Sequence, residues 1–112
     1  MESQLELYNE GVKFLAKIKE ALPAEMAAQE AVRAAVYRDG ALSLKVKRLI
    51  SLASALRAGC PNCIVGQTKG AVEAGATKEE VLEATAVVVA SSGTTALAQS
   101  YRVVKVLEEL GY

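Results

Sequence analysis

Turn and capping residues divide the chain into six segments, and these boundaries limit the possible folds more than any other feature of the sequence. They lie at Pro23, Asp39-Gly40, Gly59, Gly75 and Ser91-Ser92-Gly93. Proline fits the first turn of a helix, and glycine often ends one in the left-handed backbone conformation. Apolar side chains recur at helical spacing between these points. We therefore predict an all-α fold of about six helices, in one domain that covers residues 1–112.

Two of the expected helices have a defined apolar stripe. In residues 3–21 the apolar positions follow one another at steps of three and four: Leu5, Tyr8, Val12, Leu15 and Ile18. In the helix that begins after Ser43 they are Val46, Leu49, Ile50, Ala53 and Leu56. Such stripes predict that both helices pack against other parts of the chain.

The segment after Gly75 is apolar on nearly every side. Thr77 and Glu80 have the capping-box spacing, which predicts that a helix begins after Thr77. The β-branched residues Val87–Val89 would also suit a strand, but the capping box and the neighbouring alanines favour a helix. A helix with so little polar surface is expected to be buried, within the monomer or between subunits. The alanine-rich, aromatic-poor composition also favours close helix packing and self-association.

Charge and hydropathy exclude several classes of partner. The 13 basic and 13 acidic residues cancel, and no stretch is strongly basic, so no nucleic-acid partner is expected. No apolar run reaches the roughly 18 residues of a membrane span, so no membrane partner is expected. The amino-terminal segment is acidic and amphipathic, unlike a signal peptide. We therefore expect a soluble protein of the cytoplasm.

The only two cysteines, Cys60 and Cys63, stand three residues apart where the fourth helix is expected to begin. Unpaired backbone N–H groups and the helix dipole favour a thiolate over a thiol there. Side chains at this spacing on a helix have Cβ atoms roughly 5–6 Å apart, whereas a disulfide needs about 3.5–4.5 Å. If Cys60 is the N-cap, its backbone is not yet helical and the gap can close. The pair therefore predicts a disulfide that forms and opens.

Other interpretations of the cysteine pair remain open. Two buried cysteines can act simply as small hydrophobic core residues. A structural zinc ion needs about four ligands, and without histidine the chain would have to use carboxylates or a second subunit. A permanent disulfide is disfavoured in the cytoplasm. Thioredoxin places its CxxC after a strand, and no convincing βαβ pattern is present here.

Residues 35–93 resemble the carboxymuconolactone decarboxylase-like family, specifically its alkylhydroperoxidase D-like branch. The features that carry the resemblance are Lys47 before the stretch LISLA, then Cys60 and Cys63, the stretch AGATKEEVLEA, and Gly93. The resemblance implies a helical bundle with CxxC at the start of a central helix, assembled as a trimer or hexamer. It also implies reaction with a peroxide, or with a protein or small-molecule disulfide, followed by reduction by a thiol. No metal, flavin, haem or other cofactor is implied.

The same resemblance implies catalytic roles for both cysteines. Cys63 would be oxidised by peroxide to a sulfenic acid, and Cys60 would resolve it as a disulfide. The family's proton relay uses a histidine and a carboxylate, but those positions hold Gln67 and Arg48, neither of which acts as a base at pH 7. Arg48 could instead lower a thiol pKa through its fixed charge, and Gln67 could donate a hydrogen bond to a thiolate. Equally, both could be ordinary surface residues.

The leading hypothesis is thus an alkylhydroperoxidase D-like thiol oxidoreductase, an antioxidant enzyme of the peroxidase or disulfide-reductase type. The alternative is a non-catalytic or redox-sensing oligomer on the same scaffold, because the usual relay is missing. Lactone decarboxylation ranks last, since the branches that perform it use histidines and this chain has none. Tyr37, Lys47 and Asn62 are weaker candidates for the entrance of the site.

Overall fold

The computed structural model describes residues 1–112 and contains six α-helices and no strand. Their bounds are α1 (Gln4–Ala21), α2 (Pro23–Val36), α3 (Leu44–Ala58), α4 (Pro61–Glu73), α5 (Lys78–Ser92) and α6 (Thr94–Glu109). The prediction of an all-α fold is confirmed, and Val87–Val89 are helical. None of the six helices combines the length and the apolar content needed to cross a bilayer.

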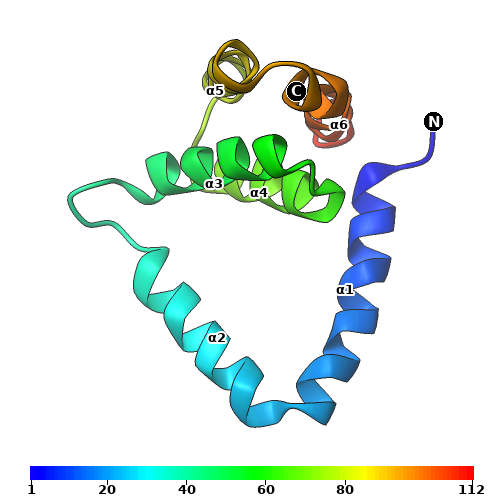
Figure 1. Cartoon of the computed structure of the whole chain (residues 1–112), viewed down its shortest axis with the longest axis vertical. Coiled ribbons are helices and arrows are strands. Elements are labelled where there is room, and N and C mark those ends of the chain that lie inside the picture. Colours follow the sequence, from blue (N-terminus) through cyan, green and yellow to red (C-terminus); the bar gives the residue numbers. More distant parts are fainter.

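Helices α3 to α6 form the packed part of the molecule, with α3 and α4 side by side and α5 and α6 covering them (Figure 1). Each of these four helices contributes to one hydrophobic core. Its largest fully buried apolar side chains are Leu52, Leu56, Ile64, Val81, Val103 and Leu107. The start of α4, which carries the cysteines, is therefore fixed to a close-packed core.

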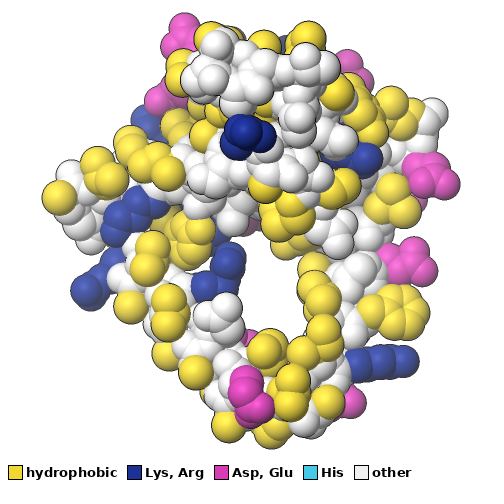
Figure 2. All heavy atoms as spheres, in the orientation of Figure 1, with side chains coloured by type: hydrophobic (Ala, Val, Ile, Leu, Met, Phe, Trp, Pro, Cys, Tyr) yellow, Lys and Arg dark blue, Asp and Glu magenta, His cyan; other side chains and the backbone are white.

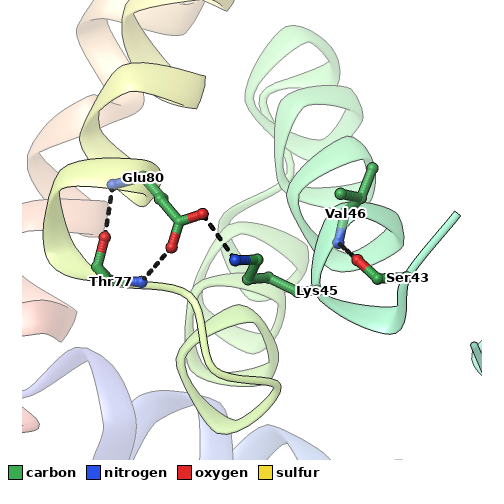
Figure 3. Close-up of polar contacts among 5 residues, drawn as sticks. All are labelled: Ser43, Lys45, Val46, Thr77 and Glu80. Atoms are coloured by element: carbon green, nitrogen blue, oxygen red, sulfur yellow. Dashed lines mark hydrogen bonds and ion pairs between the residues drawn. The ribbon is translucent and has the colours of Figure 1, made fainter.

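The capping box expected at the start of α5 is present (Figure 3). The Thr77 hydroxyl accepts from the Glu80 backbone N–H at 3.1 Å, and a Glu80 carboxylate oxygen accepts from the Thr77 backbone N–H at 3.0 Å. The other Glu80 oxygen lies 2.9 Å from Lys45 Nζ on α3. The backbone hydrogen bond from Thr77, followed by the bond from Lys45, lowers the pKa of Glu80. This carboxylate thus fixes the first turn of α5 to α3.

Helices α1 and α2 form a V, in which α1 contacts α4 and α6 and α2 diverges from the packed part (Figure 1). The first turn of α1 is attached to α6: Ser3 and the Gln4 backbone N–H both donate to the Glu109 carboxylate, the second at 2.9 Å. Burial alone would raise the pKa of Glu109, but these hydrogen bonds outweigh it and the pKa is lowered. The backbone of α2 approaches only α1. An opening therefore remains between the V and the packed helices (Figure 2).

Apolar residues on several helices are more exposed in the structure than the sequence suggests. On α3 the buried residues are Leu52, Ala55 and Leu56, whereas Ile50 is 51% exposed. On α5, Val87 is 67% exposed, so the helix is not buried all round within the monomer, and its burial between subunits stays a prediction. On α1 the distal part of the stripe faces solvent, as does all of α2 except half-buried Met26. In each case the sequence identifies an apolar face, but no helix of the same chain covers it.

Candidate functional site: the disulfide at the start of helix α4

Cys60 and Cys63 form a disulfide at the amino end of α4. Cys60 is the N-cap residue and has an extended backbone, with φ −90° and ψ 104°. Pro61 then occupies the first helical position, where its missing N–H costs no hydrogen bond. The two Cα atoms lie 5.3 Å apart. The local geometry predicted from the sequence, with an N-cap cysteine that reaches the next one, is confirmed.

The two sulfurs have different surroundings. The Cys60 sulfur accepts a hydrogen bond from the Cys63 backbone N–H at 3.4 Å and so takes the place of an N-cap oxygen. Cys60 is half-buried, whereas Cys63 is exposed. Cys63 is also the cysteine that lines a surface depression of about 440 Å³. An incoming molecule in this depression therefore meets Cys63 first.

The depression, called here the Cys63 depression, is lined by four helices. Helix α4 contributes Asn62, Gln67 and Lys69 besides Cys63. The other helices contribute Tyr8, Val12 and Leu15 of α1, Arg33 of α2, and Arg48 of α3. The wall is thus apolar on the α1 side and basic where α2 and α3 approach.

Arg48 and Gln67, the two residues that the resemblance places at the relay positions, are in direct contact. Arg48 Nη1 donates to Gln67 Oε1 at 3.2 Å. The guanidinium also lies over the Tyr37 ring, 4.0 Å from its centroid. Its stem crosses α4 at Gly70, where a Cβ atom would lie 3.2 Å from Arg48 Cδ. The structure therefore brings Arg48, Gln67 and Cys63 together, as a cation and an amide beside a sulfur. Neither Arg48 nor Gln67 hydrogen-bonds to a sulfur.

The weaker sequence candidates separate into three positions. Asn62 lines the Cys63 depression. Tyr37 does not, but its hydroxyl lies 2.5 Å from Ser51 Oγ and its ring supports Arg48. Lys47 is outside the site, because its ammonium donates to the Val36 carbonyl at the end of α2. No three Cys, Asp or Glu side chains gather in an arrangement that could hold a metal ion.

Tyr8 and Arg33 are site residues that the sequence did not reveal. The phenol of Tyr8 lies against Gly66 so closely that a Cβ atom at Gly66 would be 2.9 Å from the Tyr8 hydroxyl oxygen. The available signal was a glycine within α4, three residues after Cys63, because an isolated glycine inside a helix often has a packing reason. Arg33 gave no such signal, because a charged residue on an amphipathic helix is ordinarily solvated.

The fold and the site define an all-helical protein with a CxxC disulfide at the start of a central helix. The chain belongs to the carboxymuconolactone decarboxylase family, whose model matches residues 23–106. This confirms the family resemblance found in the sequence, and the alkylhydroperoxidase D-like branch is consistent with it.

Two relatives and two solved structures extend the comparison. Uncharacterized protein 4 in the cox locus of Paracoccus denitrificans is 40% identical over 67% of this chain and 68% of its own length. A Cupriavidus necator protein is 36% identical over 66% of both chains. An apo crystal structure of a carboxymuconolactone decarboxylase family protein from Legionella pneumophila superposes with a TM-score of 0.92, at 28% identity and over 100% of both chains. A Thermotoga maritima family member, for which a part in the antioxidative response has been suggested, gives 0.81 at 28% identity over 92% of this chain and 88% of its own.

Proposed function

We propose that this protein is an alkylhydroperoxidase D-like thiol oxidoreductase in which Cys63 reacts with the substrate and Cys60 resolves the product. The observation that carries the proposal is the different setting of the two sulfurs. Cys63 lines an open depression, whereas Cys60 is half-buried and accepts the N-cap hydrogen bond. Membership of the family supports this assignment, as does the antioxidative role suggested for the Thermotoga maritima relative.

The reaction starts from the reduced pair. With a peroxide, the Cys63 thiolate attacks one oxygen, the O–O bond breaks, and a sulfenic acid and an alcohol or water form after one proton is taken up. Attack by the Cys60 thiolate on the Cys63 sulfur then forms the disulfide and releases water after a second protonation. With a disulfide substrate, Cys63 forms a mixed disulfide and expels one thiolate, and Cys60 expels the other. In both cases the protein loses two electrons, which an external thiol returns.

The capping hydrogen bond suits Cys60 to the resolving role. A thiolate at this position gains the Cys63 N–H and the positive end of the α4 dipole. It is therefore kept ready to attack an adduct on Cys63. In the return reaction a reductant attacks the exposed Cys63 sulfur, and Cys60 leaves as the same stabilised thiolate.

Arg48 and Gln67 act through charge and hydrogen bonding in this proposal. Arg48 supplies a fixed positive charge to the Cys63 depression, which favours a thiolate. Because the Gln67 carbonyl oxygen already accepts from Arg48, its amide N–H₂ group is free to donate. Solvent must then take and return the protons. Loss of general acid–base help slows turnover by a factor on the order of 10²–10⁴.

Mass spectrometry of the fully reduced protein tests the proposal. On treatment with peroxide or a small disulfide, the wild type should lose two hydrogens and form the Cys60–Cys63 bond. Cys60→Ser should accumulate a sulfenic acid or mixed disulfide on Cys63, whereas Cys63→Ser should form no disulfide. The proposal is wrong if the reduced wild type forms no Cys60–Cys63 bond over a wide range of either oxidant.

One observation favours a second candidate function, a non-catalytic or redox-sensing protein. The pair at the relay positions, Arg48 and Gln67, contains no base. Repeated turnover with excess thiol reductant separates the two functions. An enzyme consumes many equivalents of oxidant per chain, whereas a sensor consumes one.

We further propose that residues 1–112 form one domain of a cytoplasmic homo-oligomer, a trimer or a hexamer. The exposed apolar side chains of the α1–α2 V support the assembly. Peroxide or disulfide substrates and a thiol reductant complete the expected partners.

A further inference from the structure

Two arginines of the Cys63 depression have no carboxylate partner. Arg33 and Arg48 both line it, and the chain's three ion pairs involve only lysines: Lys19–Glu30, Lys45–Glu80 and Lys69–Glu73. The one acidic side chain in the wall, Glu73, lies 3.8 Å from Lys69 Nζ of the same wall. The two guanidinium groups therefore give the depression a net positive charge.

Both guanidinium groups are held at one aromatic ring. Arg48 lies 4.0 Å and Arg33 5.2 Å from the centroid of Tyr37. Arg48 is also fixed by Gln67 and by its close passage over Gly70. A guanidinium has five N–H donors in a planar fork, and Arg48 uses one on Gln67. Most donors remain free, in an arrangement suited to the planar oxygens of a carboxylate.

The absence of a base at the relay positions favours one of the two substrate classes. Peroxide reduction expels an alkoxide or hydroxide, which needs a proton at once. Thiol–disulfide exchange expels a thiolate instead. Because the pKa of a thiol is only about 8.5, the thiolate can leave without a proton from a protein acid. A site that holds Arg48 and Gln67 in place of acid–base groups is therefore better suited to a disulfide.

We propose that Arg33 and Arg48 bind a carboxylate, so that the preferred substrate is a small disulfide with a negatively charged end. The carboxylate lies at the two guanidinium groups, the carbon chain contacts Val12 and Leu15 on the α1 side, and the sulfurs reach Cys63. The two exchange steps described above then oxidise the protein pair and release two thiols. The reaction rests on the proposed function; the carboxylate subsite does not.

A charge series of disulfides tests the selectivity. The reduced protein is mixed with 3,3′-dithiodipropionate, 2-hydroxyethyl disulfide or cystamine, and each rate is divided by that of the same disulfide with 2-mercaptoethanol. The normalised rate should fall from anion to neutral molecule to cation. Arg33→Gln should slow the anion about tenfold, the effect of losing one charge-assisted hydrogen bond, and slow 2-hydroxyethyl disulfide by a smaller factor. Arg57→Gln, at an exposed arginine outside the depression, is the matched control and should change none of the rates.

Binding to the oxidised protein separates the subsite from the chemistry. Adipate has two carboxylates and no sulfur, and adipamide is its neutral counterpart. An NMR titration should show adipate shifting the signals of Arg33, Arg48 and Gln67, with affinity about tenfold weaker in Arg33→Gln, and adipamide shifting none.

The outcomes distinguish the two proposals. If no disulfide oxidises the reduced pair but adipate binds, the proposed disulfide chemistry fails and the subsite stands. The subsite is wrong if the three normalised rates are equal, if Arg33→Gln slows the neutral disulfide as much as the anion, or if adipate and adipamide give the same shifts.

Discussion

Arg48 stands where the family resemblance implies the carboxylate of a proton relay. It hydrogen-bonds to Gln67, lies over the Tyr37 ring, leaves little room for a Cβ atom at Gly70, and lines the same depression as Cys63. Arg48→Gln should therefore raise the pKa of the Cys63 thiol, because a fixed positive charge near a thiolate is lost. In the reduced Cys60→Ser variant, where Cys63 is the remaining thiol, Arg48→Gln should make alkylation of Cys63 by iodoacetamide several-fold slower at pH 7. Unchanged alkylation across pH 6–9 would show that the charge of Arg48 does not reach the sulfur.

Gly66 and Gly70 give a paired test of the contacts around the site. Each glycine-to-alanine change adds helix propensity of up to about 1 kcal/mol. At Gly66 the new Cβ would lie 2.9 Å from the Tyr8 phenol, and overpacking costs about 1–3 kcal/mol. We therefore expect Gly66→Ala to lower the free energy of unfolding by about 1 kcal/mol net. Gly70→Ala meets only the flexible Arg48 stem at 3.2 Å and should leave that free energy unchanged or raised.

Urea unfolding measures both variants, and Tyr8→Ala supplies the control. In the Tyr8→Ala background, Gly66→Ala should no longer destabilise, because the ring that it contacts is absent. Equal costs in both backgrounds would mean that the contact between α1 and α4 does not limit the packing at Gly66.

At the level of single helices, Glu80 makes the beginning of α5 dependent on pH. Its pKa lies below the ordinary value of 4.5, first because of the backbone hydrogen bond from Thr77 and then because of Lys45. The unfolded chain consequently binds more protons than the folded chain just below pH 4.5. The stabilisation is fully present above that pH and is lost as the pH falls through the folded-state pKa.

Glu80→Gln should therefore reduce the loss of stability on acidification. A glutamine keeps the capping-box hydrogen bond but not the charge. Urea midpoints measured at pH 7 and pH 3.5 should differ less in this variant than in the wild type. Glu79→Gln is the control, since Glu79 lies in the same first turn and its side chain makes no hydrogen bond or ion pair. The same pH dependence in wild type and Glu80→Gln would contradict the assignment.

Such local features explain how much of the structure could be predicted from the sequence. Helix starts at Ser43, Cys60 and Thr77 were predictable, because a capping bond joins residues only three apart. The positions of Tyr8 and Arg33 were not, because each meets α4 or Tyr37 only through the tertiary fold. The prediction that Ile50 packs against another part of the chain was wrong for a similar reason. Hydrophobic spacing identifies an apolar face but not the helix that covers it.

At the scale of the whole molecule, much of the apolar surface of α1 and α2 is not covered by any other helix of the chain. The backbone of α2 approaches only α1, and apolar side chains of both helices face solvent around the opening (Figure 2). Val32 is 58% exposed on α2, and Leu15 is 54% exposed on α1. Helices that leave so much apolar surface exposed gain little stability from the contacts they make within the chain. A second copy of the chain, with the same apolar helices, is the partner that would cover this surface.

Light scattering should therefore give a mass that is a multiple of 11.8 kDa at micromolar concentration. Val32→Glu should shift the mass toward 11.8 kDa, because a charge placed in an apolar interface loses its hydration without gaining a partner. Asn9→Glu adds the same charge on the outer face of α1, in a depression that the site does not share, and should leave the assembly intact. A wild type that stays at 11.8 kDa, or an Asn9→Glu variant that dissociates as readily as Val32→Glu, would contradict assembly through the V.

Assembly through the V should also affect the Cys63 depression, because α1 supplies its apolar wall and α2 supplies Arg33. Loss of assembly removes the support of both helices and should therefore weaken the selection for the anionic disulfide.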